Sequence, residues 1–386
     1  MKIGIVTHYY KSINYGGNLQ AYALCRKLGE EYDVEQIAID VKTKKIKEKV
    51  FTKNGFLNIL KEAKRQFGNF INFINLKKDK KLAKGLQLRR HAISQFNQEE
   101  IPHSKIVYTL DKIHEANNDY EVFITGSDQV WHPKAWNTAY RLDFVDKKKL
   151  KFSYAASIAR SSLNNKEKDI LKESLKNFDA ISVRENEAVN IIAPISPVQV
   201  HWVLDPVFLL TQKEWDDICS ERQVKEEYIF CYFLGESQES RFIAKEYAKR
   251  CNLKLITIPY LLGKFRKCDY DFGDEKLYEV SPKEFISLIK HSKAVFTDSF
   301  HALAFSIIYR KNFYVFNRSD SKNMSSRITS MLSIIGAEDR LIEDKEKIFE
   351  LDSIDYDSPL NRIEKMKVES IRFLNQALKK ESNYND

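Results

Sequence analysis

Residues 2–40 read KIGIVTHYYKSINYGGNLQAYALCRKLGEEYDVEQIAID, and this stretch decides the fold class. Residues 2–8 are a compact apolar run typical of a strand, and a polar turn with two glycines follows it. Apolar side chains then recur at helical spacing, before a second strand-like run at residues 33–40. A strand, a turn, a helix and a strand in this order predict a doubly wound α/β domain.

The same alternation continues along the chain and then repeats. A chain of 386 residues is too long for one ordinary core and fits two domains. We place the boundary near Asp205-Pro206, where the first half ends. The sequence therefore predicts two Rossmann-like, doubly wound domains, over residues 1–205 and 206–355, that face each other across a cleft. Residues 356–386 are expected to form a C-terminal helix and a polar tail.

One segment of the first half carries most of the positive charge. Residues 42–90 contain 16 Lys or Arg and three acidic residues, whereas the net charge of the whole chain is +9. Apolar residues recur every three or four positions over residues 56–74, which predicts an amphipathic helical insertion. This insertion either packs on its own domain or brings Lys61, Lys64 and Arg65 to an anionic membrane surface. No nucleic acid is expected as a partner, because no known nucleic-acid-binding motif accompanies the positive charge.

The ends and the cysteines of the chain bear on its location and its metal content. MKIGIVTHYY has one basic residue and a short apolar run, so we expect a first strand and not a signal peptide. No stretch approaches the ~18 consecutive apolar residues of a membrane span. We expect a cytoplasmic protein, with peripheral contact at the inner membrane face if the insertion binds lipid. The five cysteines lack zinc spacing, so no metal is expected.

Polar or glycine-containing turns follow five of the predicted strands. Ligands of doubly wound sheets bind beyond the carboxyl ends of the strands, so these turns should line one site. The turns are 14–17 (NYGG), 125–129 (TGSDQ), 155–157 (AAS), 184–185 (RE) and 297–301 (TDSFH).

Six blocks of this sequence, in this order, resemble the bacterial polysaccharide pyruvyl transferase family. They are NYGGNLQAYAL (14–24), FITGSDQVW (123–131), SYAAS (153–157), ISVRE (181–185), VLDPVFLL (203–210) and TDSFHALAFSI (297–307). The resemblance runs from residue 3 to about residue 340 and skips the basic insertion and the final helix. It implies a GT-B-like fold of two Rossmann-like domains.

The resemblance also implies a reaction. Characterised members of the family transfer a pyruvyl group from phosphoenolpyruvate to a sugar of a cell-surface polysaccharide or its precursor, forming a pyruvate ketal. Capsule and exopolysaccharide biosynthesis are the processes it suggests. The expected partners are phosphoenolpyruvate, as co-substrate, and a sugar or lipid-linked oligosaccharide acceptor. No other cofactor is expected.

His301 and Arg184 are the expected catalytic residues. His301 follows a strand and begins a helix, and an imidazole can both give and take protons near neutral pH. In the family, an equivalent histidine is assigned as the general acid that protonates the methylene carbon of phosphoenolpyruvate. Arg184 ends a strand, and a guanidinium binds carboxylate or phosphate in a planar fork. A salt bridge from Arg184 to Glu185 or Glu187 is the structural alternative.

The expected donor site combines Arg184 with four other residues. Better-studied family members carry an arginine two residues before the histidine, where this chain has Ser299. Arg327, at the start of a predicted helix, is the candidate replacement for that guanidinium. Gly16 and Gly17 would let backbone approach the ligand, with the helix N-terminus offering free N–H groups to an anion.

The expected acceptor site consists of polar and aromatic side chains from the same turns. Sugar hydroxyls would satisfy buried Ser, Asp and Gln side chains, and a Trp ring could stack on the apolar face of a sugar. The candidates are Asn14, Tyr15, Gln20, Ser127, Asp128, Gln129, Trp131 and Ser157. The structural alternatives are a helix cap in the first turn, and an Asx turn with a core Trp in the second.

Two other functions compete with pyruvyl transfer. A glycosyltransferase of the same architecture would hold the diphosphate and base of a nucleotide sugar in the C-terminal domain. The chain has no acidic DxD turn near a strand end that would suit a metal-bound nucleotide. Many GT-B enzymes need no metal, so the lack of this turn does little to distinguish a glycosyltransferase from a pyruvyl transferase. A non-catalytic binding module is the third possibility, and it would have less need of a proton donor such as His301.

Overall fold

The computed structural model describes residues 1–41, 80–133, 137–260, 266–318, 326–344 and 346–379. The N-terminal half forms a four-stranded parallel sheet in the order β2-β1-β5-β6, and isolated bridges join β6 and its turn to the β7-β8 pair. These strands are β1 (Lys2–Val6), β2 (Asp33–Gln36), β5 (Val122–Thr125), β6 (Leu150–Ser153), β7 (Ile181–Val183) and β8 (Val200–Trp202). A separate parallel pair joins β3 (Ile39–Asp40) to β4 (Tyr108–Thr109).

The C-terminal half forms a second parallel sheet, in the order β11-β10-β9-β12-β13. Its strands are β9 (Tyr228–Tyr232), β10 (Lys254–Thr257), β11 (Glu275–Lys276), β12 (Ala294–Thr297) and β13 (Asn312–Val315). Chain order reverses beside β9, as it does beside β1 in the first sheet. Each sheet therefore has a switch point of the kind at which such folds bind ligands, and the predicted fold class is confirmed.

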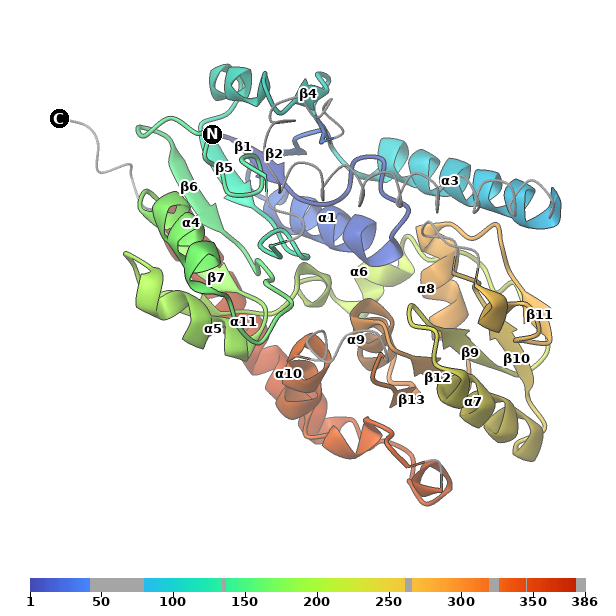
Figure 1. Cartoon of the computed structure of the whole chain (residues 1–386). Helices are drawn as coiled ribbons and strands as arrows, with labels where there is room; N and C mark the ends of the chain where they lie inside the picture. Colours follow the sequence, from blue (N-terminus) through green and yellow to red (C-terminus); the bar gives the residue numbers. More distant parts are fainter. Residues whose placement is uncertain (42–79, 134–136, 261–265, 319–325, 345, 380–386) are drawn as a thin grey trace, which may run out of the picture.

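Helices cover both sheets (Figure 1). They are α1 (Tyr15–Leu28), α3 (Lys80–Glu100), α4 (Asn165–Leu175), α5 (Asn186–Ile192), α6 (Gln212–Asp216), α7 (Gln238–Arg250), α8 (Pro282–Lys290), α9 (Phe300–Ile308), α10 (Ser326–Ile335) and α11 (Asp357–Lys379). The start of α8 shows how local sequence fixes a helix end. The Ser281 hydroxyl accepts from the Glu284 N–H at 3.2 Å, and the Glu284 carboxylate accepts from the Ser281 N–H at 2.6 Å. This is a complete capping box, with Pro282 at the first helical position.

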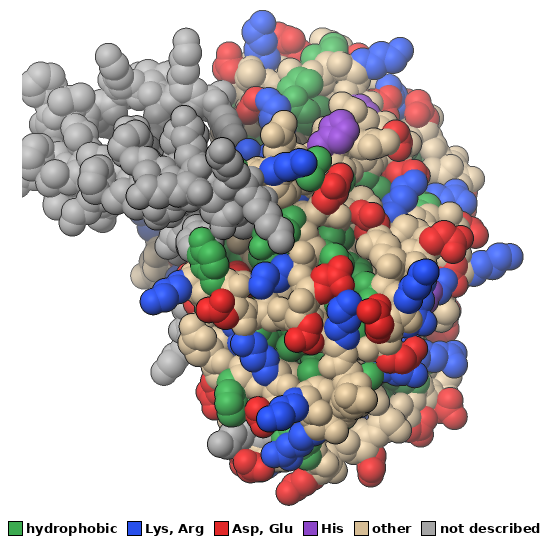
Figure 2. Space-filling model, turned by 90° about the vertical axis from the view of Figure 1, so that its right-hand side faces the viewer, with side chains coloured by type: hydrophobic (Ala, Val, Ile, Leu, Met, Phe, Trp, Pro, Cys, Tyr) green, Lys and Arg blue, Asp and Glu red, His purple; other side chains and the backbone are tan. Residues whose placement is uncertain are grey.

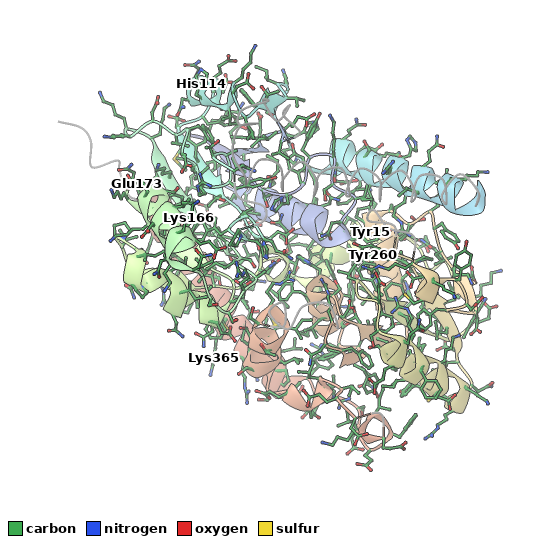
Figure 3. The ribbon with its side chains drawn as sticks, viewed as in Figure 1. Tyr15, His114, Lys166, Glu173, Tyr260 and Lys365 are labelled. Atoms are coloured by element: carbon green, nitrogen blue, oxygen red, sulfur yellow. The ribbon has the colours of Figure 1, made fainter. Side chains whose placement is uncertain are left out.

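The two halves share one hydrophobic core, because α1 of the first half packs on α8 and α9 of the second. Tyr15, at the start of α1, stacks on Phe285 of α8 with ring centroids 4.7 Å apart. Its hydroxyl donates to the backbone oxygen of Val280 at 2.9 Å. Figure 3 labels Tyr15 at the end of α1 that faces the second half. The relative position of the two sheets is therefore fixed by buried contacts.

The last helix returns to the N-terminal sheet. Phe373 of α11 packs against Phe152 and Tyr154, with ring centroids 6.4 and 6.5 Å away. The Ser370 hydroxyl accepts from the Leu204 N–H at 3.0 Å. Helix α11 thus completes the N-terminal core after the chain has built the second sheet, and residues 380–386 of the expected tail lie outside the described residues.

Helix α3 ties the two halves together from the other side. Arg89 is buried and donates to the backbone oxygens of Pro259, Leu277 and Tyr278 in the C-terminal half. A Cβ on Gly85 would lie 2.5 Å from the Tyr278 side chain, so glycine permits this close approach. The end of the basic segment therefore serves domain packing. It also continues as helix to Glu100, ten residues beyond the expected boundary at residue 90.

Most of the expected amphipathic insertion lies outside the described residues, including Lys61, Lys64 and Arg65. Figure 2 shows the face of the molecule to the right of Figure 1, where Lys and Arg alternate with Asp and Glu and hydrophobic side chains form only small separate patches. Across the described ranges, no helix combines the length and the apolar character that crossing a membrane requires.

Candidate active site

The carboxyl ends of several strands deliver polar residues to one buried cluster between the two sheets. Ser127, Asp128 and Gln129 follow β5, Arg184 and Glu185 follow β7, and Asp205 follows β8. The C-terminal half adds His301 in the first turn of α9 and Arg327 in the first turn of α10. All of these are buried except Gln129, which is half-buried. The turns predicted to lie together do so.

An ion pair between Arg184 and Asp205 forms the centre of the cluster. Arg184 Nη1 donates to Asp205 Oδ2 at 2.5 Å, and the Ser127 hydroxyl donates to the same oxygen at 2.8 Å. The guanidinium also lies over the ring of Phe300, 4.5 Å from its centroid. Burial alone would raise the pKa of Asp205, but the charges of His301 and Arg184, with the hydrogen bond from Arg184, hold it well below its usual range. Asp205 is therefore ionised at neutral pH.

His301 faces the same carboxylate. Its Nε2 lies 3.6 Å from Asp205 Oδ2, and its side chain is 7% exposed. The ring also lies directly against Gly16 of α1, where an added Cβ would come within 2.0 Å of Nδ1. Asp205 and Gly16 thus confine the imidazole from two sides. The N–H of Gly16 is already bonded to Asn14 Oδ1 at 3.1 Å, which corrects the expectation that this N–H is free for an anion.

Asp128 occupies a special backbone position beside the ion pair. Its φ of 73° lies in the left-handed region, which few residues other than glycine, Asn and Asp adopt. Its Oδ1 is 3.9 Å from Arg184 Nη2. Burial opposes its ionisation, yet the nearby positive groups, including His8 and Arg184, lower its pKa. A Cβ on Gly17 would lie 3.4 Å from Asp128 Oδ2 and 2.7 Å from the His8 carbonyl oxygen, so Gly17 allows the turns to pack closely.

Arg327 and Glu185 form the other side of the cluster. Both guanidinium nitrogens Nη1 and Nη2 of Arg327 donate to the Gln129 side-chain oxygen at 3.1 Å, with the amide oriented to satisfy both groups. Burial and the charges of Arg184 and Arg318 lower the pKa of Arg327 to about 9. Burial raises the pKa of Glu185, even though Arg184 and a hydrogen bond from Ser157 favour its ionised form. An anion in this place would relieve the repulsion between the arginines.

Several donors in the cluster have no hydrogen-bond partner among the described residues. They are Nε and Nη2 of Arg184, Nε of Arg327 and Nε2 of His301. Unpaired buried donors are costly and uncommon, so their concentration at one place indicates a site that a ligand completes. Four nitrogen donors of cationic or protonatable groups favour an anionic ligand. Within the described ranges, no group of three or more His, Cys, Asp or Glu side chains is placed to hold a metal ion.

Three expected acceptor ligands are instead part of the protein interior. Trp131 is 0% exposed and packs edge-on against Phe178 in the core. Gln20 is also 0% exposed and donates to Thr7 Oγ1 and to the Gly17 carbonyl oxygen. Tyr15 joins the two halves, as described above. These placements correct the expectation that the three side chains contact a sugar, because packing already occupies their ring faces and amide hydrogens.

The remaining predicted residues have mixed positions. Asn14 is half-buried and caps α1 with its side chain. Ser157 is fully buried, and its hydroxyl donates a hydrogen bond to Glu185. Both side chains therefore already have hydrogen-bond partners within the protein. Ser299 is the N-cap residue of α9, but its side chain makes no capping bond. Its backbone N–H donates to Thr297 Oγ1 at 2.9 Å. Ser299 therefore brings no positive charge to the cluster, whereas Arg327 does.

Sequence reasoning missed Asp205 and Glu185 as members of the site. The sequence places Asp205 at a domain boundary and in the VLDPVFLL block, and Glu185 in the 184–185 turn and as a possible partner of Arg184, but it gives neither residue a role in the site. The structure shows instead that Arg184 pairs with Asp205, while Ser157 bonds to Glu185. Its position in the sequence could have identified Asp205, because this residue also comes after a strand, directly before a proline.

Two solved structures of UDP-GlcNAc 2-epimerases have a similar architecture. UDP-GlcNAc 2-epimerase from Methanocaldococcus jannaschii has a TM-score of 0.53 at 12% identity, covering 97% of this chain and 100% of that chain. UDP-N-acetylglucosamine 2-epimerase from Rickettsia bellii has a TM-score of 0.56 at 9% identity, covering 97% and 96%. At such identities the likeness concerns the fold alone, and it agrees with the predicted GT-B-like arrangement.

A family comparison is more specific. No curated protein matches the chain. The family model described as polysaccharide pyruvyl transferase matches residues 14–320, which include Asp205, His301 and the turns after β5 and β7. Arg327 lies just beyond the matched range. Since the match covers most of the sequence, this chain belongs to the polysaccharide pyruvyl transferase family and is a transferase.

Proposed function

We propose that this enzyme transfers the pyruvyl group of phosphoenolpyruvate to two hydroxyls of one sugar, forming a pyruvate ketal and releasing phosphate. The observation that carries the proposal is the group of unpaired buried donors on Arg184, Arg327 and His301. Phosphoenolpyruvate has a carboxylate and a phosphate, each of which accepts several hydrogen bonds. Two guanidinium groups beside one imidazole suit these two anionic groups and a proton transfer to the adjacent methylene carbon.

His301 supplies the first proton in this proposal. Its imidazolium protonates the methylene carbon of phosphoenolpyruvate, which becomes the methyl group, and C2 becomes electron-deficient. A sugar hydroxyl attacks C2 and loses its proton to the imidazole, which regenerates the acid. The C2–O bond to phosphate then breaks, and a second hydroxyl attacks C2. The proton of that hydroxyl leaves with the phosphate, so atoms and charges balance.

Asp205 acts through its neighbours in this scheme. Its ionised carboxylate, 3.6 Å from His301 Nε2, stabilises the imidazolium and fixes the orientation of the ring. It also holds one nitrogen of Arg184 and leaves the other two for the ligand. Asp205 is thus a positioning residue, and its low pKa keeps it charged while His301 changes its protonation state.

Phosphate release from phosphoenolpyruvate tests the proposal, measured with acceptors that contain galactose, mannose or glucose. We expect acceptor-dependent release by the wild type and none by His301→Ala, whose melting temperature should stay within a few degrees of wild type. His114→Ala is the matched control, because His114 is exposed and lies far from the cluster (Figure 3). Phosphoenolpyruvate should also raise the melting temperature of the wild type. Stabilisation by nucleotide sugars alone would favour a glycosyltransferase and overturn the proposal.

A further inference from the structure

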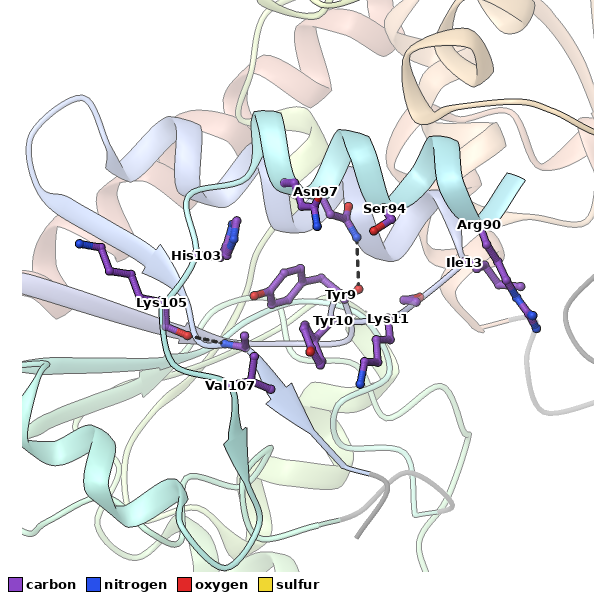
Figure 4. A pocket seen from close by; sticks show the side chains of 14 residues that line it. Tyr9, Tyr10, Lys11, Ile13, Arg90, Ser94, Asn97, His103, Lys105 and Val107 are labelled. Carbon is purple, nitrogen blue, oxygen red and sulfur yellow. Dashed lines mark hydrogen bonds between the residues drawn. The ribbon is translucent and has the colours of Figure 1, made fainter. Parts of the chain in front are cut away.

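A separate cavity of about 720 Å³ lies in the N-terminal domain (Figure 4). The loop after β1, helix α3 and the segment that leads into β4 form its walls, and none of its described lining residues belongs to the cluster around His301. A volume of this size falls in the range of small-molecule sites. The established family membership gives this cavity no role, so its chemistry has to be derived from its walls.

The described walls of the cavity are positively charged. They include no Asp or Glu and carry Lys11, Arg90 and Lys105. Lys11 is paired with Asp40 at 2.8 Å, whereas Arg90 and Lys105 have no ion-pair partner among the described residues. Figure 4 shows Arg90 and Lys105 at opposite ends of the cavity. An anionic ligand is therefore favoured at either end.

The floor between these cations is neutral and polar. Asn97 of α3 points toward the loop after β1 and the start of α1. Its Nδ2 donates to Asn18 Oδ1 of α1 at 3.0 Å and to the Tyr9 carbonyl oxygen of the loop at 3.5 Å. Its own Oδ1 is buried and has no partner in the described part of the chain. The Ser94 hydroxyl lies beside it, and the rings of Tyr9 and Tyr10 also line the cavity. Hydroxyl groups and an apolar ring face are what such a surface binds, and a sugar offers both.

A chain of hydrogen bonds joins this floor to the support of His301. Asn97 donates to Asn18, and Asn18 donates to the Asn14 carbonyl oxygen at 2.9 Å. The Asn14 side chain in turn accepts a hydrogen bond from the N–H of Gly16, and the His301 ring packs against Gly16. The loop between β1 and α1 therefore has one face on the cavity and its end on the catalytic imidazole. A ligand in the cavity lies on the same structural unit as the reacting centre.

From this arrangement we propose that the cavity recognises the acceptor, and that the acceptor is a sugar linked to phosphate. The inference rests on the proposed function, because only a pyruvyl transfer needs an acceptor sugar here. A phosphate carries more negative charge than a carboxylate, on oxygens that point in several directions, so it suits the exposed cations Lys105 and Arg90, which stand apart. Neutral donors and acceptors on the floor then bind hydroxyls other than the two that react beside His301. Nucleotide-linked sugars and lipid-linked sugars both carry a phosphate on the sugar, so both fit this description.

Calorimetric titration with three probes that differ in one group tests the proposal. The probes are hexose 1-phosphates, the corresponding uronic acids and the free hexoses, each of the gluco, galacto and manno series. Saturating phosphoenolpyruvate occupies the arginines of the central cluster, and every protein in the titration also carries His301→Ala so that no transfer takes place. In this background, Arg90→Glu/Lys105→Glu is compared with the otherwise wild-type protein and with Lys166→Glu/Lys168→Glu. The control lysines are exposed on α4, which contributes no lining residue to the cavity, and Figure 3 labels Lys166 there.

We expect at least one hexose 1-phosphate to bind wild type and control equally, and to bind the Arg90→Glu/Lys105→Glu variant at least tenfold more weakly. Tighter binding of uronic acids, or equal binding by all three proteins, would overturn the proposal. Phosphoenolpyruvate should stabilise the cavity variant as much as wild type, so a lost response to phosphoenolpyruvate in every protein would reject the proposed function instead. UDP-linked and farnesyl diphosphate-linked sugars then show which carrier the acceptor has.

Discussion

Gly16→Ala should displace the His301 imidazole, and its effect on activity can be distinguished from its effect on the stability of the fold. An added Cβ at residue 16 would lie 2.0 Å from His301 Nδ1 and 2.3 Å from its Cγ. Ordinary contact begins at 3.4 Å, so the ring has to retreat by about 1.4 Å. The ring is 7% exposed and has Asp205 on its other side, so it has no free space into which to move.

The expected cost to activity follows from this displacement. A misplacement of about 1 Å at a reacting centre costs roughly 100-fold in rate. We therefore expect kcat/KM for phosphate release by Gly16→Ala to fall by about two orders of magnitude. The effect on stability has two parts of opposite sign. Crowding a packed interior costs about 1–3 kcal/mol, while Ala in place of Gly within α1 contributes about 1 kcal/mol of helix propensity.

Urea unfolding in two backgrounds distinguishes these parts. With His301 present, Gly16→Ala should lower the free energy of unfolding, and with His301→Ala it should leave that energy unchanged or raise it by up to about 1 kcal/mol. The double-mutant cycle thus isolates the contact between residues 16 and 301. Activity within threefold of wild type, or an equal loss of stability in both backgrounds, would refute the reasoning.

Three further predictions concern the buried charges. Asp205→Asn should lower the free energy of unfolding by ~3 kcal/mol at pH 7, because Arg184 loses its charged partner. Since the pKa of Asp205 is lowered in the folded protein, the difference in unfolding free energy between wild type and variant should shrink as pH falls below ~4. Denaturation at several pH values measures this difference. Arg327→Gln should stabilise the ligand-free protein by at least ~1 kcal/mol, because burial and neighbouring guanidinium charges disfavour the charge of Arg327, while abolishing the thermal shift caused by phosphoenolpyruvate. Arg89→Ala should lower the melting temperature by several degrees, since three carbonyl oxygens of the C-terminal half lose their donor, whereas its exposed neighbour Arg90→Ala should not.

The sequence predicted which turns meet but not which side chains point into the site. Position after a strand correctly placed Arg184 and His301 in one cluster, because parallel strands end at the same edge of a sheet. Side-chain direction could not be read in the same way. Asp128 has a left-handed backbone, which breaks the alternation of sides along the chain after β5. Trp131, three residues further, therefore enters the core, and nothing in residue spacing reveals such a reversal.

The partner of Arg184 illustrates a second limit. Local spacing offered Glu185 and Glu187, yet Glu187 accepts from Ser330 of α10 at 2.7 Å, and Arg184 reaches Asp205 instead. Asp205 lies after the neighbouring strand β8, so the pair forms across the sheet. Nearness in sequence is a poor guide to ion pairs in a parallel sheet, since adjacent strands belong to distant segments.

The start of α1 serves domain packing and also supports the proposed catalytic cluster, and this explains how so many charged groups can be buried there. Tyr15 of α1 stacks on Phe285 of α8, and the next residue, Gly16, packs against the ring of His301. Any relative movement of the two halves at this point would shift the imidazole against Asp205 and expose an ion pair that is stable only when its geometry is kept. Buried charges with unpaired donors are tolerated where a large apolar core holds them in place, and here that core is shared by both halves. The stability of the domain interface therefore determines the geometry of the proposed catalytic cluster.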